Sequence, residues 1–162
     1  RHQDVSVIFD PVLVFKENHD AEISQMTAKL LEFLPFVTVI TPNLREAEML
    51  SGMTITTVSD MKVAARALSG LGSRHTVIKG GSRLDKHFAR DLYDDGSLSR
   101  EFVKPIVARN NNGAGCTFAS AIASNIARGK SVLTAVEQSK DFVYQAILNS
   151  NEYGVFQHDI NT

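Results

Sequence analysis

The sequence of 162 residues has a single cysteine, Cys116, so no disulfide can form within the chain. This excludes the small, disulfide-stapled class of secreted domains. Lysine and arginine number 17 and aspartate and glutamate 18, which gives a net charge of −1. Binding to nucleic acid through a general positive charge is therefore disfavoured. No apolar run approaches the roughly 18–20 residues that a membrane-spanning helix needs.

Proline and glycine are also scarce, at 4 and 10 residues, whereas 43% of the residues are hydrophobic and 22% are charged. These values are close to those of ordinary globular domains, so disorder and low complexity do not describe the chain as a whole. The five histidines are scattered without the spacing of a zinc site. The length fits one domain with a buried core.

Short β-branched segments alternate with longer segments of helical period along the chain. Strands are predicted at residues 5–9, 37–40, 76–78, 89–93 and 100–105, and helices at 22–33, 44–50, 60–71, 116–128 and 133–148. Strands that alternate with helices favour right-handed βαβ units. The sequence therefore predicts an α/β fold with a mostly parallel central sheet flanked by helices.

Polar clusters follow three of the predicted strands. Asp10 ends the first strand, residues 41–43 (Thr-Pro-Asn) follow the second, and residues 79–81 (Lys-Gly-Gly) follow the third. Ligands of open α/β sheets bind beyond the carboxyl ends of the strands. These clusters therefore predict a small-molecule site at one rim of the sheet, and the glycine-rich turn at 113–115 is suited to the same rim.

The glycine-rich turn contains Gly113, Ala114 and Gly115 and stands directly before a predicted helix. Its backbone amides, with the positive potential of the helix N-terminus, would form an anion hole for a phosphate or a developing negative charge. The turn lacks the Lys-Ser/Thr of a Walker A loop and the complete pattern of a dinucleotide-binding loop. An ordinary glycine-rich helix start is the alternative.

Cys116 would lie in the first turn of that helix, where the helix N-terminus lowers the pKa of a thiol. A thiolate beside an anion hole could act as a general base or as a nucleophile. A buried structural cysteine is the alternative, because a lone cysteine usually packs as a small apolar residue.

Asn43 and Glu46 are three residues apart at the start of the helix predicted at 44–50. An amide and a carboxylate at this position suit a hydrated Mg²⁺ ion. A capping box between the two side chains has the same spacing, so both interpretations stay open. Glu48, two residues further on, is expected to be a solvated helix residue.

Lys79 ends an apolar strand beside two glycines, so its ammonium could reach a polyphosphate; an ordinary strand-end lysine is the alternative. Asp10 precedes a proline and suits either a cation or a tight turn. Arg83 and Arg90 are expected to be surface charges.

Taken in order, these segments resemble the ribokinase-like superfamily, and most closely its phosphomethylpyrimidine kinase group, which includes pyridoxal kinases of similar sequence. The similarity covers nearly the whole chain, and five motifs in register carry it. They lie at residues 10–13 (DPVL), 41–48 (TPNLREAE), 77–81 (VIKGG), 91–96 (DLYDDG) and 113–118 (GAGCTF).

The resemblance implies an enzyme that transfers the γ-phosphoryl group of ATP, with Mg²⁺, to the hydroxymethyl group of a pyrimidine or pyridine, or to a phosphate already on it. It implies that the amides of Gly113, Ala114, Gly115 and Cys116 form the anion hole. Cys116 occupies the position of the catalytic base. Phosphoryl transfer of this kind depends mainly on positioning and charge stabilisation.

The resemblance also assigns the remaining polar residues of the rim. Asn43, Lys79 and Gly81 are expected to bind ATP and its phosphates. Asp10 and Glu46 are expected to organise the Mg²⁺ ion. We further expect a cytoplasmic homodimer that binds its small-molecule substrate and ATP, and neither nucleic acid nor membranes.

The acceptor substrate is less sharply predicted. Asn112 stands where the family usually has a histidine, which removes a titratable ring beside the anion hole. The run at 77–81 resembles the pyrimidine kinases, whereas residues 82–90 and 113–116 resemble the pyridoxal kinases. We expect a hydroxymethylpyrimidine/phosphomethylpyrimidine kinase, with a pyridoxal kinase as the alternative. A non-catalytic nucleotide-binding module and an enzyme with Cys116 as nucleophile are alternatives of other classes.

The chain begins Arg-His-Gln-Asp, without methionine, and its first strand corresponds to a position well inside the family fold. We therefore expect residues 1–162 to be the C-terminal, nucleotide-binding portion of one ribokinase-like domain whose N-terminal half is missing, inactive on its own. This predicts a partial sheet with one apolar edge that the absent half or a partner chain would cover.

Overall fold

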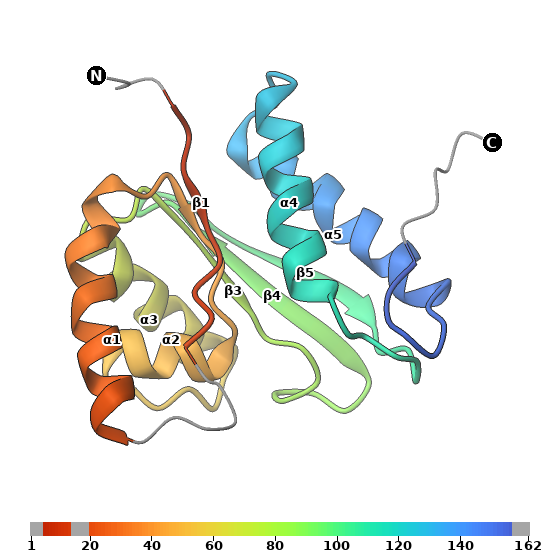
Figure 1. Ribbon diagram of the computed structural model, residues 1–162, viewed down its shortest axis with the longest axis horizontal. Helices are drawn as coiled ribbons and strands as arrows, with labels where there is room; N and C mark the ends of the chain where they lie inside the picture. The colour runs from red at the N-terminus through yellow and green to blue at the C-terminus, as the bar shows by residue number, and fades with distance from the viewer. Residues whose placement is uncertain (1–4, 14–19, 157–162) are drawn as a thin grey trace.

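The computed structural model describes residues 5–13 and 20–156 (Figure 1). A five-stranded sheet separates two groups of helices. The helices are α1 (Asp20–Phe33), α2 (Leu44–Ser51), α3 (Val58–Gly70), α4 (Ala114–Ala127) and α5 (Val132–Leu148), with a 3-10 turn η1 (Leu34–Phe36). The strands are β1 (Ile8–Phe9), β2 (Val39–Ile40), β3 (His75–Lys79), β4 (Phe88–Asp94) and β5 (Ser99–Pro105). Each predicted strand and helix is found, with small shifts at its ends.

The sheet is mixed, so the prediction of a mostly parallel sheet was wrong for this part of the chain. Its order is β1-β2-β3-β4-β5, with β1, β2 and β3 parallel and with β4 antiparallel to both β3 and β5. Parallel neighbours need a crossover of a dozen or more residues. Only residues 80–87 join β3 to β4, and residues 95–98 join β4 to β5, so these connections return the chain in the opposite direction.

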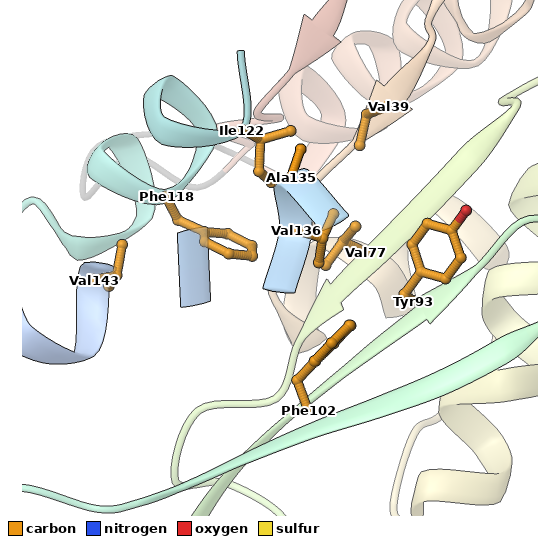
Figure 2. Close-up of a cluster of buried hydrophobic side chains, with 9 residues drawn as sticks. All are labelled: Val39, Val77, Tyr93, Phe102, Phe118, Ile122, Ala135, Val136 and Val143. Carbon is orange, nitrogen blue, oxygen red and sulfur yellow. The ribbon is translucent and has the colours of Figure 1, made fainter. Parts of the chain in front are cut away.

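Alternation along β3 divides the hydrophobic core between the two faces of the sheet. Val77 and Ile78 are adjacent and both are fully buried. Val77 packs with Phe118 and Ile122 of α4 and with residues of α5 (Figure 2). Ile78 packs on the other face against α2 and α3, where Met61 is buried. Helices on both faces therefore hold β3 in place, together with the polar residues that follow it.

β1 lies at one edge of the sheet, with β2 as its neighbour. Val5 and Val12, on either side of this strand, are 62% and 50% exposed. β1 is therefore an edge strand with an exposed valine beside each of its ends. Within the described residues, no helix is both long enough and apolar enough to cross a bilayer.

Candidate active site at the carboxyl end of the parallel strands

An ion pair joins the ends of two strands that are not neighbours. Asp10 follows β1 and Lys79 ends β3, and the Lys79 Nζ atom lies 2.6 Å from Asp10 Oδ1. Thr41, which follows the intervening strand β2, donates its hydroxyl hydrogen to the same oxygen at 2.7 Å. Both charged side chains remain partly accessible, at 17% for Asp10 and 19% for Lys79. Three parallel strands thus deliver one cation, one anion and one hydroxyl to a single point.

Asn43 and Glu46 form a complete capping box at the start of α2. Asn43 Oδ1 accepts from the Glu46 amide at 2.9 Å, and Glu46 Oε2 accepts from the Asn43 amide at 2.7 Å. The segment is also tied to the ion pair, because the Lys79 amide donates to the Pro42 carbonyl at 2.8 Å. The capping alternative is therefore confirmed, and the cap itself belongs to the rim of the sheet.

Glu46 is a buried carboxylate within reach of the charges of the ion pair. It is only 5% exposed, and burial is the main reason why its pKa is raised above the ordinary value of 4.5. The hydrogen bond from Asn43 and the attraction of Lys79 oppose this rise, whereas the charge of Asp10 adds to it. A carboxylate with these neighbours gains from any further cation placed beside it.

The glycine-rich turn lies directly over the ion pair. Gly113 is the N-cap of α4 and has φ of +83°, a left-handed conformation that favours glycine. A Cβ atom on Gly115 would stand 3.3 Å from Lys79 Nζ and 3.8 Å from Asp10 Oδ2. The first turn of α4 is thus in contact with both charged groups, and only the absence of a side chain keeps the space open.

The helical hydrogen-bond ladder of α4 begins where Thr117 donates to Gly113. The amides of Gly113, Gly115 and Cys116 precede this first bond and are suited to bind an anion. The Ala114 amide differs, because it donates to the Asn111 carbonyl at 3.0 Å. In this conformation the Ala114 amide is therefore not available to the predicted anion hole.

Cys116 is exposed in the first turn of α4, so the alternative of a buried structural cysteine is wrong. It borders an open pocket of about 540 Å³ together with Asn112, Gly113 and residues of the 151–156 segment. Cys116 does not line the larger cavity described next, although its neighbours Ala114 and Gly115 do.

A larger cavity of about 600 Å³ lies between the sheet rim, α4 and α5. Its lining includes Asn43, Lys79, Gly81, Ala114 and Gly115 among the predicted site residues. The end of β5 and α5 contribute both apolar side chains and lysines to the wall, namely Pro105, Ile106, Val143, Tyr144 and Ile147 together with Lys104 and Lys140. A cavity lined by cationic and apolar side chains suits a ligand that joins phosphates to a flat ring.

Asp10 and Glu46 are the carboxylates that the structure brings near the anion hole. Among the described residues, no group of three or more histidines, cysteines, aspartates or glutamates is arranged to hold a metal. Mg²⁺ commonly keeps several waters and binds one or two carboxylates together with substrate phosphates. The donor set therefore fits a hydrated Mg²⁺ ion carried by a nucleotide and does not form an all-protein cage.

Sequence reasoning missed several contacts around this site. Glu48 was expected to be solvated, but it forms a two-pronged ion pair with Arg83, with both N–O distances 2.8 Å, and this contact is the main reason why the pKa of Glu48 is lowered. Asp91 and Lys140 form a buried ion pair in the wall of the larger cavity. The sequence feature that could have indicated this ion pair is Asp91 itself, an aspartate in the middle of a predicted strand.

The sequence profile of the family described as "Phosphomethylpyrimidine kinase" matches residues 1–161. The chain belongs to this family. It is 38% identical over 146 residues to the hydroxymethylpyrimidine/phosphomethylpyrimidine kinase of Bacillus subtilis, covering 89% of this chain and 54% of that protein. It is also 38% identical over 154 residues to the pyridoxine kinase of Bacillus subtilis, covering 91% and 57%.

Solved structures of the family agree with the fold. The Staphylococcus aureus pyridoxal kinase in complex with AMP-PCP and pyridoxal superimposes with a TM-score of 0.78 at 40% identity, covering 91% of this chain and 53% of that one. The chain thus spans about half the length of the relatives it matches. The expectation of this kinase group, drawn from five short motifs, is confirmed.

Proposed function

We propose that the full-length protein is an ATP-dependent kinase of a vitamin precursor and that residues 1–162 are its nucleotide-binding portion. One observation carries this proposal above the others. The Asp10–Lys79 ion pair lies beside the N-terminus of α4, and Lys79 borders a cavity large enough for a nucleotide. A site built in this way offers positive potential to phosphates from a lysine and from backbone amides at once.

In this proposal the chain's own groups act mainly by position and charge. Lys79 neutralises the phosphate chain, and the amides of Gly113, Gly115 and Cys116 stabilise the charge on the oxygens of the transferred group. Bound Mg²⁺, held through Asp10 and Glu46, would supply further neutralisation of the phosphate oxygens. Apolar side chains of the cavity wall, such as Ile106 and Val143, hold the base of ATP.

Cys116 is proposed to act on the acceptor side of the anion hole. In its thiolate form, the Sγ atom accepts the proton of the acceptor hydroxyl as that oxygen forms a bond to the γ-phosphorus, and ADP leaves with the electrons of the broken bond between the γ-phosphorus and the bridging oxygen. The exposure of Cys116 beside the smaller, open pocket supports this role, because an acceptor can approach there without crossing the nucleotide cavity.

We propose a hydroxymethylpyrimidine, or its phosphate, as the acceptor, on the strength of the run Val77–Gly81 and of the family profile. Pyridoxal is the second candidate, because the pyridoxine kinase of Bacillus subtilis is as similar to this chain as the pyrimidine kinase is. Because the sequence identity to the two kinases is equal, the acceptor must be decided by a direct measurement.

The test is a kinase assay of the full-length protein on hydroxymethylpyrimidine, its phosphate and pyridoxal side by side, with ADP release as the readout. A higher kcat/KM for either pyrimidine supports the primary proposal, and a higher value for pyridoxal supports the second candidate. Binding of Mg-ATP by calorimetry without turnover of any of the three would instead indicate a non-catalytic nucleotide-binding module. Asn112 stands where the family usually has a histidine, so the assay should include this test for nucleotide binding without turnover.

A further inference from the structure

Asp91 is a buried carboxylate in the wall of the nucleotide cavity that the proposed chemistry does not use. It lies on β4 and is 5% exposed. Its Oδ1 atom accepts a hydrogen bond from the Gly80 amide at 3.1 Å, and its Oδ2 atom accepts from Lys140 Nζ at 2.5 Å. Both oxygens are therefore engaged by the protein itself.

These contacts join three separate parts of the cavity wall. Gly80 belongs to the loop that follows β3, Asp91 to β4, and Lys140 to α5, and all three border the cavity. Burying an ion pair costs desolvation, and an apolar pair of similar volume would stabilise a fold as well or better. Stability alone thus gives no reason for a charged pair at this place.

The loop after β3 is closely fitted against β4. A Cβ atom on Gly80 would stand 2.0 Å from the Arg90 carbonyl oxygen, so the backbone has no room for a side chain. Lys79 is paired with Asp91 in the register of the two strands. The hydrogen bond from Gly80 to Asp91 therefore fixes the first peptide after Lys79, and with it the course of the chain to Gly81.

We propose that Asp91 is a positioning residue for the nucleotide. It holds the loop of residues 79–81 in the shape that receives the phosphates, and Lys140 neutralises its charge so that the cavity wall does not repel a polyanion. The inference rests on the proposed function, because the nucleotide is the ligand that benefits. Asp91 is not proposed to bind the nucleotide itself, because it is only 5% exposed and each of its oxygens already accepts a hydrogen bond from the protein.

The experiment compares Asp91→Ala and Asp91→Asn in the full-length protein, with ADP affinity measured by calorimetry. Alanine frees the loop; if the loop then adopts its binding shape about one-tenth of the time, ADP affinity falls and the KM for ATP rises about tenfold. The KM for the acceptor is expected to change by less than about twofold, because the acceptor does not use this loop. Asparagine keeps an oxygen for the Gly80 amide, so affinity stays within about threefold of wild type.

Asp94 supplies a matched control on the same strand. It is fully buried, accepts a hydrogen bond from the Gly96 amide at 2.8 Å, and pairs in register with Thr76, at the end of β3 away from the site. Asp94→Ala therefore removes an equivalent contact between a buried aspartate and a loop glycine. We expect it to lower the melting temperature and to leave ADP affinity unchanged.

Three results would overturn the inference: wild-type ADP affinity in Asp91→Ala, an equal loss in Asp94→Ala, or an Asp91→Asn variant as weak as the alanine variant. A wild-type protein that binds ADP but phosphorylates none of the three acceptors would refute the proposed function. In that case ADP affinity alone still decides the role of Asp91. A wild-type protein with no affinity for ADP would overturn both.

Discussion

The substitution Gly115→Ala separates the stability of the fold from the function of the site. Alanine favours a helix over glycine by about 1 kcal/mol in a helix interior, and by about half as much in the first turn, where Gly115 lies. The added methyl group would stand 3.3 Å from Lys79 Nζ, so this flexible side-chain end must move by a few tenths of an ångström. We therefore expect the melting temperature to stay level or to rise by about 1–2 °C.

The same methyl group lies between the charges that would receive a phosphate. It would be 3.8 Å from Asp10 Oδ2, and it displaces the ammonium of Lys79 from its position 2.6 Å from Asp10 Oδ1. Misplacing a reacting group by about 1 Å can cost about a hundredfold in rate, and the shift here is only a few tenths of an ångström, so we expect kcat/KM for ATP to fall about tenfold, or about 1.4 kcal/mol.

Gly70→Ala is the matched control for this prediction. Gly70 is the last residue of α3, and a Cβ atom there would meet nothing within 4 Å. It should change the melting temperature slightly and leave kcat/KM unaltered. Thermal unfolding and a coupled assay of ADP release measure both quantities. An active Gly115→Ala variant would refute the reasoning, because the phosphates would then approach by another path.

The remaining predictions concern three further positions. Cys116→Ala should keep the melting temperature, because the side chain is exposed, and lower turnover about 10²–10⁴-fold; unchanged turnover would remove Cys116 from the chemistry. Because the pKa of Glu46 is raised in the folded state, its contribution to the free energy of unfolding is fully present below pH 4.5 and is lost as the pH rises through the pKa of the folded state. Glu46→Gln should remove this pH-dependent loss, which chemical denaturation at pH 4 and at pH 7 would measure. Asn110→Ala removes hydrogen bonds of 3.1 and 2.9 Å from this side chain to the carbonyls of residues 151–152, so the free energy of unfolding should fall by about 1 kcal/mol. Hydrogen exchange at the Val155 amide, which bonds to the Asn112 carbonyl, should become faster, and an unchanged exchange rate would contradict the prediction.

Several features of the site were predictable because they depend on local spacing. The capping box of Asn43 and Glu46 needs only residues three apart at a helix start. Glycines directly before α4 were expected to let the backbone turn there, and Gly113 has a positive φ at this point. The placing of Asp10 and Lys79 at one rim followed from the shared edge of parallel strands, and the structure brings the two side chains into contact.

Other features were missed because they depend on connections and packing between distant segments. The antiparallel direction of β4 relative to β3 is set by the short link at residues 80–87, which the strand pattern alone did not identify as a reversal of the chain. The pairing of Asp91 with Lys140 joins residues 49 positions apart through the packing of α5 on the sheet. Such a pair has no signature in either segment taken by itself.

The sequence by itself determined the kinds of element, the polar groups that end each strand, and the family to which the chain belongs. These properties follow from hydrophobic period, from capping chemistry and from motifs of a few residues. Only the tertiary structure decided which of those groups touch. Asp10, Lys79 and Gly115 meet because β2 lies between the first two and because Phe118 and Ile122 hold α4 on the face above them. Contacts of this kind come from the packing of the whole sheet, which no single segment encodes.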